Sequence, residues 1–283
     1  MFKFPHKYRI ALVAPAGGIS PETAASGRAI LEKYGHEVKI MPHLFTGGTL
    51  LHLSADDTDR VSDINAAIDD EEIEIIWAVR GGAGSLRILD RINWKKLKDS
   101  GKYFAGFSDI TAIHWAMAAN NSCRYLAAPM MKFLAENREP LTGETLFAAL
   151  NGSPVSLQLP ALRPGSVNGT ALAGNLTVAA ALCGSRYLPD TTGRVLVLED
   201  IGEAPYRIDR CLTQLRINGV FDHCAGIIFG RFTDCGNEPE LMAVLKDFTG
   251  KVSCPVFCGL CHGHELPFYS LCGTQEISVT AAG

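Results

Sequence analysis

The segment Ile75–Arg87, with the sequence IIWAVRGGAGSLR, decides how this chain is expected to fold. Its apolar first half predicts a buried strand. The Arg-Gly-Gly-Ala-Gly stretch that follows predicts a tight turn, because glycine adopts backbone angles that other residues avoid. After the turn, apolar and charged residues recur at helical spacing. We therefore predict strand, turn and helix, with Ser85 at the corner between the turn and the helix.

A serine at such a corner has two properties of a nucleophile. Its hydroxyl is held away from the backbone, and the free N–H groups at the helix start can stabilise an anion. Glycine-rich turns also hold phosphate or simply reverse the chain, so the turn alone leaves these readings open. The dinucleotide fingerprint fails because Arg87 stands where its third glycine belongs, and no Gly-Lys-Ser/Thr of a phosphate loop follows. No nucleotide cofactor is expected.

Bulk composition points to a soluble globular enzyme of one large or two ordinary domains. The chain has 283 residues, of which 47% are hydrophobic and 20% charged. A formal charge of −4 provides no general basic face for nucleic acid. No apolar run approaches the roughly 18 residues that span a membrane, and no secretory signal is visible. Nine cysteines, an odd number, favour reduced thiols in a cytoplasmic protein.

Strands and helices alternate through the first half of the chain. This alternation predicts a parallel α/β sheet with helices on both faces, over residues 1–135. Ligands of such sheets bind beyond the carboxyl ends of the strands, where Ser85 and Ser108 both fall. Ser108 and Asp109 are also interpreted as the cap of a helix over Ile110–Ala119. Proline and glycine punctuate residues 136–170, which we predict to be a linker before a second domain at 171–283.

A nucleophilic serine needs a base, and the histidines differ in their surroundings. His264 follows a glycine in a loop after an apolar run, a position well suited to face a site. His262 is its rival, and the sequence favours His264 only slightly. The segment also holds Cys258-x-x-Cys261, but zinc sites usually have two separated ligand pairs. We therefore expect no metal.

The carboxylate that would orient this base is expected at the end of a strand. Glu199 directly follows the apolar run Val195–Leu198 and is the first candidate. Asp200 and Glu203 are close rivals for this role. For Glu199 and Asp200, helix capping or a solvated turn is an equal alternative. The order serine, acid, histidine is the order in α/β-hydrolases.

Several segments together resemble the motifs of one family, the LD-carboxypeptidases, also called muramoyl-tetrapeptide carboxypeptidases. The resemblance extends over nearly the whole chain. The segments are Arg80–Arg87 (RGGAGSLR), Gly106–His114 (GFSDITAIH), Gly174–Leu176 (GNL), Leu198–Arg210 (LEDIGEAPYRIDR), Gly263–His264 (GH) and Leu271–Gly273 (LCG).

The resemblance implies a fold and an activity. It implies an N-terminal flavodoxin- or Rossmann-like α/β domain, a C-terminal domain with a small β-barrel-like mixed sheet and helices, and a site between them. It further implies a serine peptidase with a Ser-Glu-His triad, carried across by matching position to Ser85, Glu199 and His264. The family's usual substrate is a cytoplasmic murein tetrapeptide, whose terminal D-alanine is released by cutting an L,D bond. A homodimer is also implied.

The remaining site residues follow from this hypothesis. The backbone N–H of Leu86 and one from the Gly81-Gly82 turn, taken as Gly82, would form the oxyanion hole. Arg80 and Arg87 are the nearest cations for the substrate's terminal carboxylate, with a structural ion pair as the alternative. Ser108 and Asp109 are further candidate substrate contacts. The mechanism requires no cofactor or metal.

Two departures from the family motifs leave the substrate open. Ala83 stands where the motif has tyrosine, and Ala127-Ala128 stands where the family often has His-Gly. A microcin-immunity type of hydrolase, acting on peptidyl or aminoacyl adenylate-like amides, is the alternative within this fold. A non-catalytic peptide-binding protein is the alternative of another class, and a redox module built on Cys258 and Cys261 is the weakest.

Overall fold

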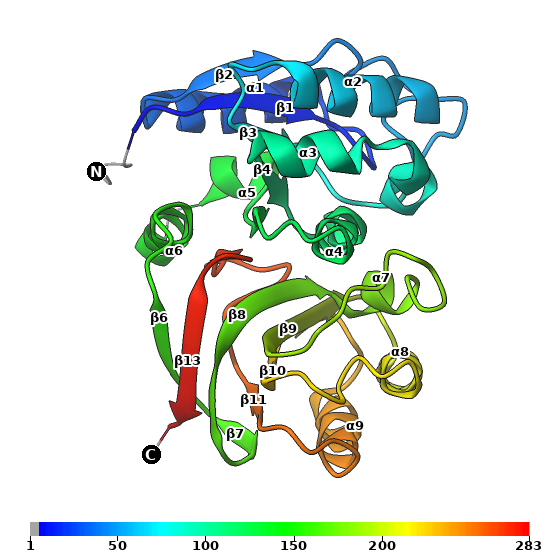
Figure 1. Cartoon of the computed structure of the whole chain (residues 1–283), viewed down its shortest axis with the longest axis vertical. Coiled ribbons are helices and arrows are strands. Elements are labelled where there is room, and N and C mark those ends of the chain that lie inside the picture. The colour runs from blue at the N-terminus through cyan, green and yellow to red at the C-terminus, as the bar shows by residue number, and fades with distance from the viewer. Residues whose placement is uncertain (1–5, 138, 283) are drawn as a thin grey trace.

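The computed structural model describes residues 6–137 and 139–282, which form two α/β units stacked along the long axis of the molecule (Figure 1). The first unit contains a sheet in the order β12-β5-β4-β3-β1-β2. Strands β1 to β5 pair in parallel, and β12 joins β5 in antiparallel orientation. The strands are β1 (Arg9–Val13), β2 (Glu37–Ile40), β3 (Ile75–Ala78), β4 (Tyr103–Gly106), β5 (Tyr125–Ala127) and β12 (Leu271–Cys272).

Helices cover both faces of this first sheet, as the alternating pattern predicts. Side chains of β1 alternate between two cores: Ile10 and Leu12 pack toward α1 and α5, whereas Ala11 and Val13 pack toward α2 and α4. Ser20 caps α1, because its Oγ accepts the N–H of Thr23. The helices are α1 (Pro21–Lys33), α2 (Asp57–Asp69), α3 (Trp94–Ser100), α4 (Thr111–Ala119) and α5 (Met131–Glu136), with 3₁₀ turns η1 (Ser85–Arg91) and η2 (Ser108–Ile110).

The second unit is a curled mixed sheet with helices on its outer side, in agreement with the expected β-barrel-like sheet. Its order is β6-β13-β8-β9-β10-β11-β7, and the long strand β8 bends around the sheet beside β13 (Figure 1). The strands are β6 (Val155–Leu159), β7 (Ala161–Arg163), β8 (Ser166–Asn175), β9 (Arg194–Ile201), β10 (Gly226–Thr233), β11 (Val256–Cys258) and β13 (Glu276–Ala281). The helices of this unit are α7 (Leu176–Ala180), α8 (Pro205–Ile217) and α9 (Glu238–Thr249). Helix α6 (Pro140–Leu150), which precedes β6 in the chain, packs Leu146 and Ala149 into the core of the first sheet.

The segment predicted to be a linker contains regular structure. Residues 136–170 include α6, β6, β7 and the first part of β8. Proline and glycine punctuate the segment because they separate short elements, not because the chain there lacks structure. The boundaries of the two domains remain a prediction.

Direct hydrogen bonds between the units fix their relative position. Trp115 Nε1 on α4 donates to Ala173 O on β8 at 3.2 Å, and Tyr125 OH donates to Ala171 O at 2.9 Å. Both side chains are buried. These bonds hold β8, and with it the neighbouring β9, against α4 and β5 of the first unit.

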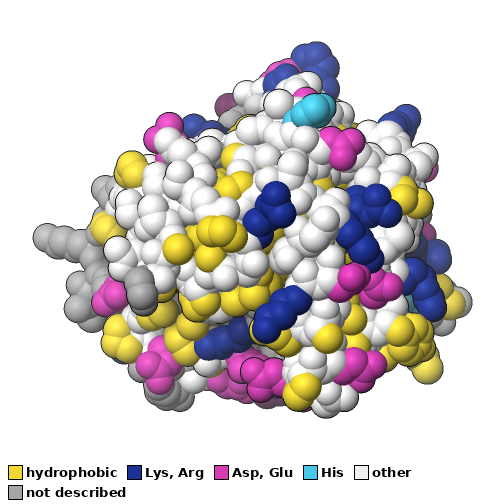
Figure 2. Space-filling view, turned by 90° about the horizontal axis from the view of Figure 1, so that it is seen from below, with side chains coloured by type: hydrophobic (Ala, Val, Ile, Leu, Met, Phe, Trp, Pro, Cys, Tyr) yellow, Lys and Arg dark blue, Asp and Glu magenta, His cyan; other side chains and the backbone are white. Residues whose placement is uncertain are grey.

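The charged side chains on one face of the molecule are mixed in sign (Figure 2). On the face seen from below, basic side chains are interspersed with acidic and apolar ones (Figure 2). Within the described ranges, no helix has the length and hydropathy needed to cross a membrane.

Candidate active site

Three side chains from both units form a continuous chain of hydrogen bonds. His264 Nδ1 lies 2.8 Å from Glu199 Oε2, and His264 Nε2 lies 3.0 Å from Ser108 Oγ. A carboxylate only accepts, so Nδ1 carries the ring proton and donates to Glu199. Nε2 is then free to accept the hydroxyl proton of Ser108. This is the relative arrangement of nucleophile, base and orienting acid in serine hydrolases.

Ser108 occupies a sharp corner between a strand and a helix. It follows β4 and begins η2, which leads directly into α4. Its φ angle is 63°, in the left-handed region that residues other than glycine rarely adopt. Such strain is concentrated at functional sites, where the surrounding structure enforces it. Ser108 therefore has the strand–turn–helix geometry that the sequence analysis assigned to Ser85.

Glu199 and His264 reach this corner from the second unit. Glu199 is near the end of β9 and is almost fully buried, with 1% of its side chain exposed. His264 lies in the loop after β11, and its ring packs against Phe107 at a centroid distance of 5.0 Å. Burial excludes water from the Glu199–His264 pair and strengthens its electrostatic interaction.

The rivals of these two residues are engaged elsewhere. Asp200 is buried and accepts hydrogen bonds from Asn175 and from both the backbone and the hydroxyl of Thr177, which anchors α7 to β9. Burial raises the pKa of Asp200, and these hydrogen bonds oppose the rise. Glu203 forms an exposed ion pair with Arg207.

His262 has a structural position. It is fully buried, and its Nδ1 donates to Tyr269 O at 2.8 Å. Burial lowers the pKa of His262, which keeps the ring neutral. Cys258, one of the two cysteines weighed as a zinc ligand or a redox group, donates its thiol proton to Pro160 O, with an Sγ–O distance of 3.7 Å.

Ser85, which the sequence analysis took as the nucleophile, lies outside the hydrogen-bonded chain. The structure does not support that hypothesis, because the histidine contacts Ser108 instead. The side chain of Ser85 is completely buried, and it does not line the cavity that Ser108 and His264 share. Its backbone N–H donates to Asp109 Oδ2 at 2.8 Å. The imidazole of His264 forms its hydrogen bond with Ser108, at the neighbouring strand end. Ser85 instead fastens the glycine-rich turn to the start of η2.

Asp109 is part of this same connection and does not face the cavity as a substrate contact. It is buried, and burial raises the pKa of its carboxyl group while the bond from Ser85 N–H opposes the rise. The predicted contact through its side chain is therefore not supported. Its backbone N–H, by contrast, immediately follows the nucleophile candidate.

The glycine-rich turn approaches Ser108 closely. A Cβ atom placed on Gly81 would lie 2.9 Å from Ser108 Cβ, 3.0 Å from Ser108 Oγ and 3.3 Å from Asp109 N. The absent side chain leaves room beside the hydroxyl for a carbonyl group. Gly82 lines the same cavity, whereas Leu86 belongs to η1 behind it. The geometry thus favours Gly82 N–H and Asp109 N–H as the oxyanion donors, in place of Leu86.

The two arginines predicted to read a carboxylate have different roles. Arg87 forms a two-pronged ion pair with Asp57, with Nε–Oδ1 and NH2–Oδ2 distances of 3.0 and 2.8 Å. This pair lowers the pKa of Asp57 and joins η1 to α2, so Arg87 takes the structural alternative. Arg80 is exposed, donates to Gly18 O at 2.7 Å and lines the cavity.

The cavity in front of Ser108 measures about 690 Å³, a size suited to a short peptide. It combines apolar walls, including Phe107, Met130 and Phe133, with two cations, Arg80 and Lys132. Aspartate and glutamate are absent from the described lining. An anionic ligand with some apolar character fits this lining. Sequence reasoning missed Lys132, which the turn after β5 brings to the site.

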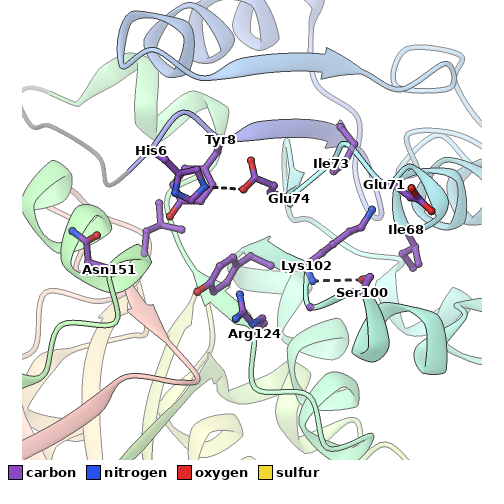
Figure 3. A pocket seen from close by; sticks show the side chains of 13 residues that line it. His6, Tyr8, Ile68, Glu71, Ile73, Glu74, Ser100, Lys102, Arg124 and Asn151 are labelled. Atoms are coloured by element: carbon purple, nitrogen blue, oxygen red, sulfur yellow. Dashed lines mark hydrogen bonds and ion pairs between the residues drawn. The ribbon is translucent and has the colours of Figure 1, made fainter.

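A cavity of similar size lies at the amino ends of the first sheet's strands (Figure 3). Several of its polar groups are already engaged: His6 Nε2 lies 2.7 Å from Glu74 Oε1, Lys102 N donates to Ser100 Oγ at 3.4 Å, and Lys102 Nζ donates to Ala67 O at 3.1 Å. Parallel sheets bind ligands at the opposite, carboxyl edge. We therefore assign the site to the cavity at Ser108.

Comparison with known families agrees with the fold and with the motifs. The model of the LD-carboxypeptidase N-terminal domain matches residues 10–128, and that of the LD-carboxypeptidase C-terminal domain matches residues 168–279. The chain belongs to the LD-carboxypeptidase family. A putative carboxypeptidase of Streptomyces coelicolor is 34% identical to this LD-carboxypeptidase homologue, over 90% of the chain and 85% of that protein.

Solved structures show the same architecture. The crystal structure of a muramoyltetrapeptide carboxypeptidase from Oxalobacter formigenes has a TM-score of 0.83 and 28% identity, and covers 95% of this chain and 94% of its own. An MccF-like protein from Bacillus anthracis has a TM-score of 0.88 at 18% identity, with coverage of 99% and 95%. The second likeness shows the fold alone.

Proposed function

We propose that this family member is a serine carboxypeptidase that hydrolyses the L,D bond to the terminal D-alanine of murein tetrapeptides, with Ser108 as its nucleophile. The observation that carries the proposal is the hydrogen-bonded chain from Ser108 through His264 to the buried Glu199, facing a cation-lined cavity. The family and the name of the Oxalobacter relative support the substrate class. A role in peptidoglycan recycling in the cytoplasm, as a homodimer, is part of this proposal.

The arrangement supports acyl transfer in two stages. His264 Nε2 takes the hydroxyl proton as Ser108 Oγ attacks the scissile carbonyl, and Glu199 stabilises the imidazolium. The N–H groups of Asp109 and Gly82 hold the developing oxyanion. His264 then gives its proton to the amine of the departing D-alanine. Water, activated by the same histidine, releases the peptide from Ser108.

The function is tested by measuring D-alanine release from a murein tetrapeptide by the purified protein. Release by the folded wild type supports the proposal. Absence of release, with hydrolysis of a peptidyl adenylate-like amide, would favour the microcin-immunity type. Binding of the tetrapeptide without any hydrolysis would indicate a binding protein.

The close approach of Gly81 to Ser108 yields a prediction. Gly81→Ala is expected to lower kcat/KM by about 10²–10³-fold, because the methyl group enters the space of the scissile carbonyl and disturbs the oxyanion donors. Gly250→Ala is the matched control. Gly250 follows α9, far from the site, and its φ of −70° is one that alanine adopts readily. The Gly250→Ala variant should therefore have the activity of wild type. The measurement is kcat/KM for D-alanine release by both folded variants, compared with wild type. Wild-type activity in Gly81→Ala would contradict the assigned approach of substrate.

The two cations of the cavity predict recognition of the terminal carboxylate. A tetrapeptide whose C-terminus is an amide should have a kcat/KM lower by about tenfold or more, since a charge-assisted bond is lost. In a variant carrying both Arg80→Met and Lys132→Met, the acid and the amide should be hydrolysed equally well. An undiminished preference for the acid in that variant would show that another group reads the carboxylate.

A further inference from the structure

A buried arginine, Arg60, packs against the glycine-rich turn. Its side chain lies on α2 and is 1% exposed. One nitrogen of its guanidinium group, Nη1, donates to two backbone carbonyls, Gly84 O at 3.1 Å and Pro15 O. The other, Nη2, pairs with Asp57 Oδ1 at 2.5 Å. Taking a guanidinium group out of water costs free energy, so a buried one is held by several polar partners, as here.

The carbonyl partners of Arg60 follow two neighbouring strands. Pro15 comes after β1, and Gly84 belongs to the turn after β3. Because β1 and β3 pair in parallel, one guanidinium group joins both loops at the carboxyl edge of the sheet. Glycine at position 84 permits this contact, since its φ is 126° and a Cβ atom there would lie 3.1 Å from Arg60 Nη1.

The carboxyl group of Asp109 joins a third strand end to the same turn. Asp109 lies in η2, which follows β4, and its Oδ2 accepts the N–H of Ser85 at 2.8 Å. Burial raises the pKa of Asp109, and both the Ser85 N–H and the charge of Arg60 oppose that rise. The end of the turn is thus held at Gly84 O by a buried cation and at Ser85 N by a buried carboxyl group.

The turn and η2 each contain one of the two N–H groups that the geometry favours as oxyanion donors, Gly82 and Asp109. Such donors lower the activation barrier when they are already oriented before the charge develops on the carbonyl oxygen. Gly82 has a φ of 105° in a turn rich in glycine, whose backbone has many accessible conformations. Contacts from outside the turn are therefore needed to fix the Gly82 N–H, and Arg60 and Asp109 make such contacts.

We propose that Arg60 is a positioning residue of the oxyanion hole. Together with the Asp109 carboxyl group, it holds the glycine-rich turn so that the N–H groups of Gly82 and Asp109 point at one oxygen atom. This inference rests on the proposed function and adds a residue that acts on the reaction through the turn.

The first test replaces the guanidinium group by an apolar side chain. Arg60→Met is expected to lower kcat for D-alanine release by about 10²-fold, close to the loss of one oxyanion donor, with KM within about threefold of wild type. Lys102→Met is the matched control. Lys102 is also a buried cation that donates to two backbone carbonyls, Ala67 O and Asp70 O, but it precedes β4 and lies at the opposite, amino edge of the sheet. The Lys102→Met variant should keep the kcat of wild type.

A tetrahedral inhibitor tests the oxyanion hole directly. The probe is a peptide boronic acid: a bond forms between Ser108 Oγ and boron, the hydroxyl proton passes to His264, and the boronate becomes a tetrahedral anion. Arg60→Met should weaken binding of this probe by about the factor by which it lowers kcat/KM, because both depend on the tetrahedral state. In a Ser108→Ala background, Arg60→Met should change the Kd of the tetrapeptide substrate by no more than about threefold, since the substrate carries no oxyanion.

Conservative variants keep the inference testable if Arg60→Met folds poorly. Arg60→Lys retains a charged donor for the carbonyl groups but not the planar fork that also holds Asp57, and should lower kcat by about tenfold. Asp109→Asn retains an oxygen that accepts the Ser85 N–H. Its kcat should therefore exceed that of Asp109→Ala by about tenfold or more.

The outcomes separate this inference from the proposed function. Wild-type kcat in folded Arg60→Met, or equal losses of kcat in Arg60→Met and Lys102→Met, would overturn the inference and leave the carboxypeptidase intact. Equal weakening of boronate and tetrapeptide binding would also overturn it, because that is the effect of a purely structural role. Hydrolysis of no tetrapeptide by folded wild type would overturn the proposed function and the inference with it.

Discussion

Ser108→Ala is expected to lower kcat/KM for D-alanine release by about 10⁴–10⁶-fold, the range found when the nucleophile of a serine hydrolase is removed. His264 Nε2 lies 3.0 Å from Ser108 Oγ, so the alanine variant retains the base and loses the group that it activates. Its fold should be unchanged, because the substitution removes one oxygen at the wall of a cavity. Circular dichroism and thermal unfolding check this, and a serine-directed phosphonate should label wild type at Ser108 alone.

Ser85→Ala is the matched control for this experiment. Both serines follow neighbouring strands of one sheet, but the Ser85 side chain is completely buried and away from the cavity. We expect the Ser85→Ala variant to keep kcat/KM within about threefold of wild type, as is usual for small changes outside a site. The opposite pair of results, activity lost in Ser85→Ala and kept in Ser108→Ala, would restore Ser85 as the nucleophile.

Glu199→Gln is expected to lower kcat by about 10⁴-fold. The carboxylate accepts the proton of His264 Nδ1 and thereby leaves Nε2 as the acceptor for Ser108. An amide nitrogen at this position can donate to Nδ1 instead, which places the ring proton on Nε2 and prevents it from acting as a base. The amide also fails to stabilise the imidazolium that forms during attack. KM should change much less than kcat.

Glu203→Gln is the control within the same segment. Glu203 was a rival candidate for the acid, but its carboxylate pairs with Arg207 at 3.3 Å on the surface. Exposed ion pairs contribute little to stability, about 0–1 kcal/mol, so this variant should behave as wild type. A large loss in Glu203→Gln together with near-normal activity in Glu199→Gln would refute the assignment of the acid.

Local patterns in the sequence were sufficient for the first sheet and for the choice of Glu199 and His264 as candidates for the acid and the base. The apolar run before Glu199 indicated a position near the end of a buried strand, and the glycine before His264 indicated a loop after one; the structure has Glu199 near the end of β9 and His264 in the loop after β11. The second sheet required more than local patterns. The segment 136–170 has many prolines and glycines, which is why the sequence predicts a linker there. Its strands β6 and β7 are instead stabilised by pairing with β13 and β11, which are distant in the chain.

The choice between the two serines shows why local patterns do not suffice. Both Ser85 and Ser108 follow buried strands and precede helical turns, and parallel pairing of β3 with β4 brings both to one edge of the sheet. The sequence contained a signal at Ser108, a serine directly after a strand and before a helix. That same pattern is also typical of a helix cap.

The sequence by itself determined the alternating α/β pattern, the edge at which the site lies, and the acid and histidine candidates, because these follow from periodicity and from residues at strand ends. Only the tertiary structure decided which serine meets His264. The histidine comes from 156 positions farther along the chain, and its place depends on how the second unit packs on α4. That packing turns the imidazole to Ser108 and leaves Ser85 buried in the turn beside it.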